Sequence, residues 1–382
     1  MKILNVCDIM NPLYGGSVVR SFQISQHMID AGYDVDLLTT SWNIDYKYIS
    51  KITGGEKYIL DVFGKTNSNN PKIIPKGLFK WIRQNIEKYD VIHVSRNWSL
   101  LASIVALMAR NKGIPYIYSP MGFIGSNNKS KLIKSLYRNF FTIPDIKNAS
   151  SCIAVSKEEE LDINNIIGNS NKTTLIPNGI ILSDFDYQNN KLFRSEYKLD
   201  QRNIILFIGR MEPIKGINLL IDAYSNLDSI HDDWCLVLIG TNTEFKKSMI
   251  KKTNELKMNN NIFFLDPLFA DKKSAAYHAA EVIAIPSVKD AMTIIAPEAA
   301  CCKKPILYTN SCDFPDLAEN GGGLEIDPSV NAIQKGLEKI THPHFNRKEM
   351  GLKGYNYVVK NFKWTELIKR YVLIFQSSIK EI

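Results

Sequence analysis

The chain has 382 residues, of which 45% are hydrophobic and 23% charged, and its formal net charge is +8. This length exceeds what one hydrophobic core usually supports, so we expect two domains. No run of about 18 apolar residues is present, which argues against a helix that spans a membrane. The six cysteines are scattered and none has the CxxC spacing of zinc sites, which favours a reduced, cytoplasmic protein.

Short apolar runs alternate with helical stretches in the first half of the chain. Six of these runs have the length of buried strands: 3–7, 34–40, 90–95, 115–120, 151–156 and 173–177. Strands separated by helices, such as the one expected at 18–32, predict a parallel sheet covered on both faces. Gly15 and Gly16 connect the first strand to that helix. Their backbone N–H groups could approach a phosphate closely, and a flexible turn is an equally good interpretation.

The positive charge is concentrated between residues 70 and 140, where twelve Lys and Arg residues stand against two acidic ones. Two stretches there, 72–88 and 129–141, are basic and amphipathic, and the apolar face of the first carries Leu78, Phe79, Ile82 and Ile86. Such helices suit anionic lipid headgroups, although a solvated face over the core is the alternative for each helix singly. Together they predict peripheral membrane contact, and the candidate residues are Lys76, Lys80, Arg83, Lys129, Lys131 and Lys134.

The alternation restarts after a polar stretch at 180–200. The second series of strand-like runs is 203–209, 234–240, 261–267, 282–287, 304–310 and 323–326. A helical pattern at 217–227 lies between the first two of these runs, and an amphipathic helix at 364–379 has no strand after it. The fold class is therefore α/β, with two Rossmann-like lobes that face a cleft. We place the lobes at residues 1–185 and 186–382.

Two cations follow the first strand of the second lobe. Arg210 comes directly after Gly209, and Lys215 stands five residues further on, before the next helix. Cations at a helix start oppose the helix dipole, so a bound anion explains them better than a solvated loop does. Arg and Lys are the usual side-chain clamps for a pyrophosphate. They also stabilise the negative charge that builds up on a departing nucleoside diphosphate.

An acidic pair occupies the segment 286–307, where a loop leads into a helix. Asp290 and Glu298 could accept hydroxyl groups of a sugar or a ribose, while the backbone N–H groups of Met292, Thr293 and Ile294 could face a phosphate. An N-cap aspartate followed by a glutamate in the first helical turn is a common structural arrangement. Taken alone, this segment favours that structural interpretation.

Together and in this order, these motifs resemble the GT-B glycosyltransferases, most closely glycosyltransferase family 4, over nearly the whole chain. The matching segments are "GG" (15–16), "DVIHVS" (90–95), "LIPNGI" (175–180), "GRMEPIKG" (209–216), Asp290 with Glu298, and "FPDLAENGGGLEI" (314–326). The "GRMEPIKG" motif and the acidic pair are specific in combination, whereas each is weak alone.

The resemblance implies an enzyme that moves a sugar, with retention, from a UDP or GDP sugar to a carbohydrate or polyprenyl-linked acceptor. The pathway would be the synthesis of a surface polysaccharide or glycoconjugate, in the cytoplasm or at the inner face of the cell membrane. The resemblance also allows the last helix to pack on the first lobe.

The family's donor-site residues carry over to this chain as candidates. Arg210 and Lys215 would hold the diphosphate, Glu298 the ribose and Asp290 the transferred sugar, and these four are the catalytic candidates. The remaining donor-binding candidates are Gly15, Gly16, Gly209, Met292, Thr293 and Ile294. The nucleotide sugar is a substrate, and neither a metal nor another cofactor is expected, because the two cations supply the countercharge.

The chain departs from the family pattern at both substrates. Asp290 is one carbon shorter than the usual glutamate, and "AMTI" follows it in place of a glycine-containing turn. Both changes alter the part of the site that would bind the donor sugar. On the acceptor side, Ser95 replaces the second histidine of the family's H-x-H strand. Met121 stands where many relatives carry His or Arg. We interpret His93 as a core histidine, and the acceptor-side candidates are Ser95, Asn97, Met121 and Gly122.

Two other functions compete with this interpretation. One is a GT-B enzyme that epimerises or phosphorolyses its substrate. The other is a non-catalytic protein that binds a nucleotide sugar or a polyanion, which the altered segment "DAMTIIAPE" and the positive charge of residues 70–140 would favour. Nucleic acid is not an expected partner, because the basic residues are not interleaved with exposed aromatic residues in a known binding motif.

Overall fold

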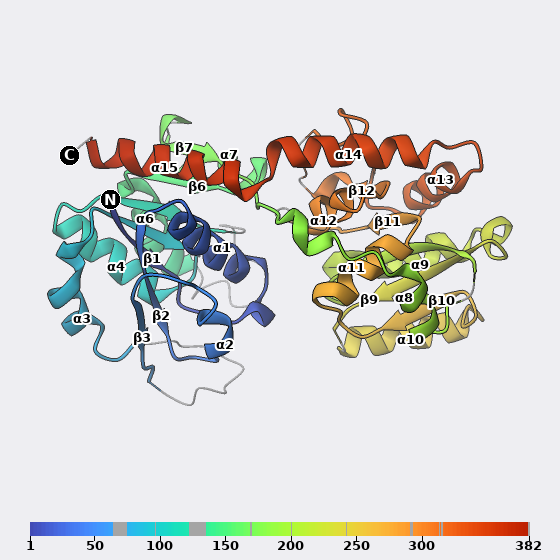
Figure 1. Cartoon of the computed structure of the whole chain (residues 1–382), viewed down its shortest axis with the longest axis horizontal. Coiled ribbons are helices and arrows are strands. Elements are labelled where there is room, and N and C mark those ends of the chain that lie inside the picture. Colours follow the sequence, from blue (N-terminus) through green and yellow to red (C-terminus); the bar gives the residue numbers. More distant parts are fainter. Residues whose placement is uncertain are drawn as a thin grey trace. The chain divides into compact units, whose positions relative to one another are not determined.

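The computed structural model describes residues 1–63, 75–95, 97–121, 135–168, 170–199, 201–241, 243–290, 293–312, 314 and 316–380. The chain forms two compact units (Figure 1). Unit 1 comprises Met1–Gly179 together with Trp364–Ile382, and unit 2 comprises Ile180–Lys363. The last helix, α15 (Trp364–Lys380), therefore belongs to unit 1 although it follows unit 2 in the sequence.

Unit 1 is built on a seven-stranded parallel sheet with the order β3-β2-β1-β4-β5-β6-β7. Its strands are β1 (Lys2–Val6), β2 (Asp34–Thr40), β3 (Lys57–Leu60), β4 (Val91–Ser95), β5 (Tyr116–Ser119), β6 (Ser151–Ala154) and β7 (Thr173–Leu175). The six strands expected in this half are all present. The edge strand β3 was not expected, because its four residues are only partly buried and lack a continuous apolar run.

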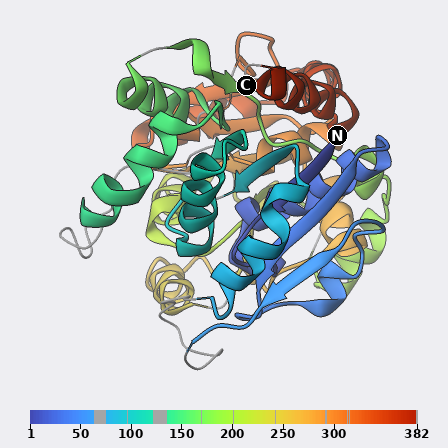
Figure 2. The same ribbon diagram turned by 90° about the vertical axis from the view of Figure 1, so that its left-hand side faces the viewer.

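Helices cover both faces of this sheet. They are α1 (Gly16–Asp30), α2 (Tyr46–Ile49), α3 (Leu78–Asn85), α4 (Leu100–Asn111), α6 (Ile143–Asn148), α7 (Lys157–Ile167) and α15. Figure 2 shows the unit from its side, with α15 in red above the blue strands of the N-terminal half. Helices α1 and α15 pack against each other, and Tyr371 and Phe375 of α15 contact the ring of His93 on β4.

The buried side chain of Arg20 on α1 holds α15 in place. Its guanidinium donates to the side-chain oxygen of Asn178 (2.8 Å), to the carbonyl of Ile176 (2.7 Å) and to the hydroxyl of Tyr371 (2.5 Å). Gly179 is needed beside this contact, because a Cβ added there would lie 2.5 Å from the indole of Trp364. The segment "LIPNGI" is thus shaped by the return of the last helix to unit 1.

His93 is a core residue, as expected. It is fully buried, its Nδ1 lies 3.2 Å from Oδ1 of Asn5, and its Nε2 lies 2.8 Å from the hydroxyl of Ser119. Burial, assisted by the nearby charge of Arg20, lowers the pKa of His93 to about 3. The imidazole is therefore neutral in the folded protein at ordinary pH.

His93 should make the protein less stable in acid. The unfolded chain binds the proton of this histidine more tightly than the folded protein, so stability falls as the pH drops from about 6.5 towards 3. The slope contributed by His93 alone is at most about 1.4 kcal/mol per pH unit. In urea titrations between pH 7 and 4, His93→Gln is expected to show a shallower pH dependence. The exposed control His344→Gln should keep the wild-type slope, and an unchanged slope in His93→Gln would contradict the assignment.

Unit 2 contains a six-stranded parallel sheet with the order β10-β9-β8-β11-β12-β13. Its strands are β8 (Asn203–Ile208), β9 (Trp234–Ile239), β10 (Ile262–Leu265), β11 (Val282–Ile285), β12 (Ile306–Thr309) and β13 (Gly323–Ile326). All six correspond to expected runs. The helices are α8 (Asn190–Glu196), α9 (Ile217–Ser225), α10 (Glu244–Glu255), α11 (Ala270–Ala279), α12 (Ile295–Cys301), α13 (Val330–Thr341) and α14 (Arg347–Asn361).

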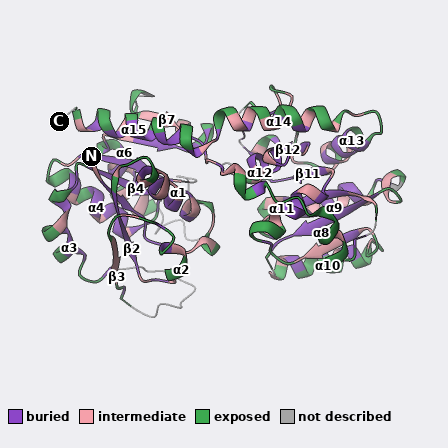
Figure 3. Ribbon diagram, in the orientation of Figure 1, coloured by how far each residue is buried: buried purple, intermediate pink, exposed green. Residues whose placement is uncertain are grey.

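The two faces of the second sheet form two separate cores. Alternate side chains of β8 point to opposite sides, so Leu206 belongs to one core and Phe207 to the other. Figure 3 shows the strands of both units as the most continuously buried segments. Two parallel sheets with helices on both faces confirm the predicted α/β fold with two Rossmann-like lobes.

The expectation that the apolar face of the first basic stretch meets lipid headgroups is wrong, because this face packs on the core of unit 1. Leu78, Ile82 and Ile86 are at most 2% exposed and pack into the core of unit 1, together with Trp81. Only Phe79 points outward, with 57% of its surface exposed. These apolar residues hold α3 onto its own sheet, so they cannot enter a lipid layer. Among the described residues, no helix is both long and apolar enough to cross a membrane.

Candidate active site

The order of the strands in unit 2 reverses between β8 and β11. In open α/β sheets of this kind, ligands bind outside the carboxyl ends of the strands at such a reversal. Two loops leave the sheet at this point: residues 209–216 follow β8, and residues 286–290 follow β11. They carry Arg210, Lys215 and Asp290, three of the four catalytic candidates.

Backbone contacts join these two loops. The backbone N–H of Val288 donates to the carbonyl of Ile214 at 2.8 Å. Gly216 has a φ of +67°, and a Cβ added there would lie 1.8 Å from the carbonyl oxygen of Pro286. Only glycine fits this close approach, which accounts for the second glycine of "GRMEPIKG" and brings Lys215 next to the β11 loop.

Lys215 and Asp290 form an ion pair. Nζ of Lys215 lies 2.5 Å from Oδ2 of Asp290, and the two side chains are 17% and 16% exposed. The backbone N–H of Asp290 donates to the carbonyl of Ser311 at 3.1 Å, which fixes the loop from the other side. An ammonium group has three donors, so Lys215 can keep Asp290 and still bind an anion.

Arg210 forms an ion pair within its own loop. Its Nη1 is 2.7 Å from Oε1 of Glu212, and its side chain is 57% exposed. An exposed ion pair of this kind is worth about 0–1 kcal/mol, so Arg210 can leave Glu212 for a ligand at little cost.

Glu298, the fourth catalytic candidate, is held by two residues of α11. Its carboxylate accepts from Nζ of Lys273, at 2.7 Å to Oε1, and from the hydroxyl of Tyr277, at 2.6 Å to Oε2. Sequence reasoning did not find either partner. The spacing of four residues, which puts Lys273 and Tyr277 on one face of a helix, was the available signal.

A second carboxyl group lies near Glu298. Burial, followed by the charge of Glu298, raises the pKa of Asp184, whereas Lys273 acts in the opposite direction. Within the described part of the chain, no group of three or more His, Cys, Asp or Glu side chains could hold a metal ion. Glu298 is thus surrounded by a second acid (Asp184), a cation (Lys273) and a hydroxyl group (Tyr277).

The remaining donor-side candidates differ in their accessibility. Gly15 has a φ of +104° at the start of α1, and a Cβ added at Gly15 or Gly16 would meet nothing within 4 Å. Gly209 directly follows β8.

Thr293 is only 2% exposed and its N–H donates to the carbonyl of Cys312 at 3.4 Å, so this N–H already has a partner. Ile294 is 36% exposed. Met292 lies outside the described residues.

The acceptor-side candidates lie in unit 1. Ser95 is fully buried and its hydroxyl donates to Oδ1 of Asn5 at 3.2 Å, which argues against direct contact with an acceptor. Asn97 is 8% exposed, and its side-chain oxygen Oδ1 accepts from the hydroxyl of Thr142 at 2.8 Å. Met121 has a left-handed φ of +56°. Gly122 lies outside the described residues.

Comparisons with known proteins match the two halves of the chain separately. The family "Glycosyl transferases group 1" matches residues 188–357, and "Glycosyltransferase Family 4" matches residues 14–184. The phosphatidylinositol N-acetylglucosaminyltransferase GPI3 subunit of Saccharomyces cerevisiae is 22% identical over 98% of this chain and 83% of its own length. The D-inositol 3-phosphate glycosyltransferase of Salinispora tropica is 21% identical over 96% of this chain and 82% of its own.

A solved structure has the same fold over nearly the whole chain. Anabaena Alr3699/HepE, in complex with UDP, superposes with a TM-score of 0.81 at 16% sequence identity, covering 99% of this chain and 100% of that one. The two family matches fall on consecutive parts of the sequence, and the fold agrees with both. The chain belongs to the GT-B glycosyltransferases of the family 4 type.

Proposed function

We propose that this glycosyltransferase takes its sugar from a UDP or GDP sugar, bound at the β8 and β11 loops of unit 2. The observation that carries the proposal is the Lys215–Asp290 ion pair at the strand-order reversal, which sets a cation for the diphosphate beside an acid for the sugar. Glu298 accepts a hydrogen bond from a hydroxyl group of the ribose. The UDP in the Anabaena HepE structure supports a nucleotide in this fold.

The reaction builds negative charge on the departing diphosphate. Lys215 stabilises that charge from a position that is only 17% exposed, where water screens it little, and Arg210 adds a second cation from the same loop. Asp290 accepts hydrogen bonds from hydroxyl groups of the transferred sugar and so orients the anomeric carbon of that sugar. His93 is buried and neutral, so it does not serve as the base. We propose retention, in which a donor phosphate oxygen takes the acceptor's proton.

The acceptor is a carbohydrate or a polyprenyl-linked glycan, in the synthesis of a surface polysaccharide or glycoconjugate. The names of the yeast and Salinispora relatives both point to inositol-containing acceptors. At 21–22% identity these names do not select the acceptor of this chain. The cytoplasm supplies nucleotide sugars and is the proposed location.

The donor is tested by calorimetry with UDP, GDP and ADP, followed by hydrolysis assays with the sugar nucleotides of the base that binds. Binding of UDP or GDP and slow release of nucleoside diphosphate from its sugar form are expected. Failure of all three nucleotides to bind to the folded protein would overturn the proposed donor site.

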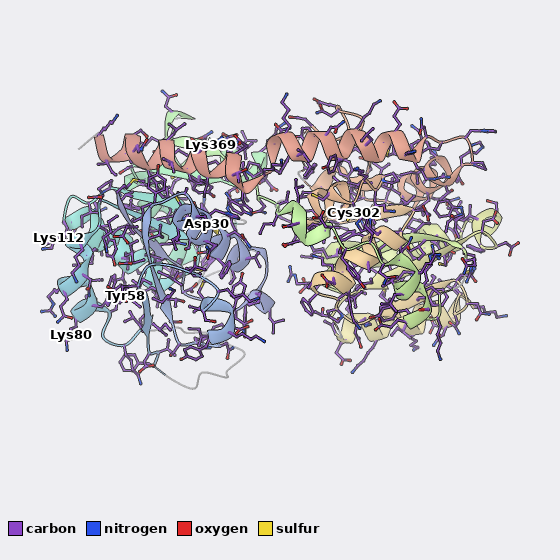
Figure 4. The ribbon with its side chains drawn as sticks, in the orientation of Figure 1. Asp30, Tyr58, Lys80, Lys112, Cys302 and Lys369 are labelled. Carbon is purple, nitrogen blue, oxygen red and sulfur yellow. The ribbon has the colours of Figure 1, made fainter. Side chains whose placement is uncertain are left out.

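We also propose that unit 1 meets anionic membrane through the exposed cations of α3. Lys80 and Arg83 are exposed on the same helix as Phe79, and Lys76 lies 5.3 Å from the ring of exposed Phe63. Lys80 on α3 and Lys112, which directly follows the neighbouring helix α4, both project outward (Figure 4). The candidates Lys129, Lys131 and Lys134 lie outside the described residues.

Liposome sedimentation tests this contact. Pelleting with anionic vesicles is expected at low salt and should weaken at high salt, because exposed charges are screened over about 8 Å at physiological ionic strength. The double variant Lys80→Glu/Arg83→Glu should lose pelleting. Lys335→Glu/Lys339→Glu, on the exposed face of α13 in unit 2, makes the same charge change and should retain it. Equal pelleting of both variants would remove α3 from the contact.

A further inference from the structure

Helix α11 presents two side chains to Glu298 from successive turns. Lys273 approaches both carboxylate oxygens, at 2.7 Å to Oε1 and 2.6 Å to Oε2, and the hydroxyl of Tyr277 lies 2.6 Å from Oε2. Lys273 is 22% exposed and Glu298 13% exposed, so both lie largely out of water. The carboxylate is therefore fixed by a cation and a hydroxyl before any ligand arrives.

The hydroxyl of Tyr277 acts only as a donor. Burial, followed by the charge of Glu298, raises the pKa of Tyr277 well above its ordinary value, so the phenol keeps its proton. The ring is fully buried and contacts Phe185 edge-on, with 5.8 Å between ring centroids. Tyr277 therefore has one orientation, and Glu298 is aligned against it.

Lys273 balances more than one acid. Asp184, on the short helix Leu182–Phe185, is close enough to Glu298 for the two charges to interact, and Lys273 offsets that interaction. A nearby negative charge disfavours the charged form of a carboxyl group, and a nearby positive charge favours it. Removal of Lys273 would therefore raise the pKa of Asp184 further.

A carboxylate has about four acceptor positions, and the contacts from Lys273 and Tyr277 use three of them. The remaining position suits a hydroxyl donor such as a ribose O–H. A carboxylate that turned away from Lys273 and Tyr277 would no longer hold this acceptor in place.

We propose that Lys273 is a positioning residue for nucleotide recognition. It neutralises and orients Glu298, so that binding of a ribose hydroxyl depends on a side chain that does not itself touch the ribose. This inference rests on the proposed function, and it predicts that Lys273 affects the ribose selectively.

The test compares UDP with its 2′-deoxy and 3′-deoxy forms, or the corresponding guanosine nucleotides if GDP is the ligand. Of the two deoxy forms, we use the one that binds the wild type more weakly. The ribose preference is its dissociation constant divided by that of the parent nucleotide. A charge-assisted hydrogen bond to one hydroxyl predicts a preference of about 10- to 100-fold in the wild type. In Lys273→Met it should fall to about threefold or less, with the affinity for that deoxy form almost unchanged.

The neighbouring lysine provides a matched control. Lys272 is on the same helix, is 59% exposed and pairs with Glu196 instead. Lys272→Met should keep the wild-type preference, and Lys273→Arg, which retains the charge, should restore most of it. Tyr277→Phe removes only a hydroxyl and gives a second, milder route to a lower preference if Lys273→Met does not fold.

The outcomes separate this inference from the proposed function. If the wild type binds neither UDP nor GDP, the nucleotide site itself is wrong. If it binds a nucleotide but folded Lys273→Met keeps the wild-type preference, the positioning role is wrong and the site stands. Equal weakening of parent and deoxy nucleotides in Lys273→Met would also overturn the inference, because it would assign Lys273 to the phosphates or the base.

Discussion

Replacing Lys215 with alanine is expected to lower turnover by about a hundredfold or more while both units stay folded. Lys215 is the partly buried cation at the strand-order reversal, and its ammonium group is held 2.5 Å from Asp290. A charge-stabilising group in a preorganised site acts mainly on the transition state, in which the departing diphosphate is most negative. The loss should therefore appear in kcat more than in KM.

Arg210→Ala should show a loss of similar size for a related reason. Arg210 is exposed and paired with Glu212, so its removal disturbs the folded protein even less than removal of Lys215. Glu212→Ala is the matched control, because it frees Arg210 without removing the cation and should stay within a few-fold of wild type. Steady-state kinetics with circular dichroism on each variant provide the measurement. If a folded Lys215 or Arg210 variant kept the wild-type kcat, that residue would not belong to the active site.

The fold could be predicted because its signals are local. The apolar runs of β8 and β9 are buried throughout, and the helices between such strands leave a parallel sheet as the simplest arrangement. The edge strand β3 escaped this reasoning, since partial burial leaves no apolar run to detect. Likewise, the apolar residues of α3 show that the helix is amphipathic but not what covers its apolar side. Burial of Trp81 places that side against the sheet.

The site could be predicted only in part, because contacts between distant residues leave no local pattern. Motif spacing and a family resemblance made Arg210, Lys215 and the acidic pair candidates, and they stay predictions. The partners of Glu298 come from α11, and Lys273 is 25 residues earlier in the chain. The spacing of four residues to Tyr277 sets Lys273 apart from Lys272, which pairs with Glu196, but this spacing does not show that Glu298 lies opposite. The rotation of one helix decides which lysine reaches the acid.

Glu298→Gln should weaken binding of the nucleoside diphosphate by about 1–3 kcal/mol, because a charge-assisted hydrogen bond to the ribose becomes a neutral one. The amide nitrogen also cannot accept from Lys273 or Tyr277, so one of those contacts is lost. Calorimetry with UDP or GDP measures the change. Unchanged affinity in a folded variant would separate Glu298 from the nucleotide.

Asp290→Asn should weaken binding of the sugar nucleotide without weakening binding of the bare diphosphate. The substitution removes a negative charge that lies 2.5 Å from Lys215, so the cation is left free for phosphate and the bare diphosphate should bind as tightly as before or more tightly. The sugar nucleotide should bind about tenfold more weakly, because its sugar hydroxyls lose a charged acceptor. Parallel titrations with the diphosphate and its sugar form measure both effects, and Ser287→Ala, next to Asp290, controls for disturbance of the loop. Equal weakening of both ligands would mean that Asp290 supports the loop and not the sugar, because only a contact with the sugar can separate the two affinities.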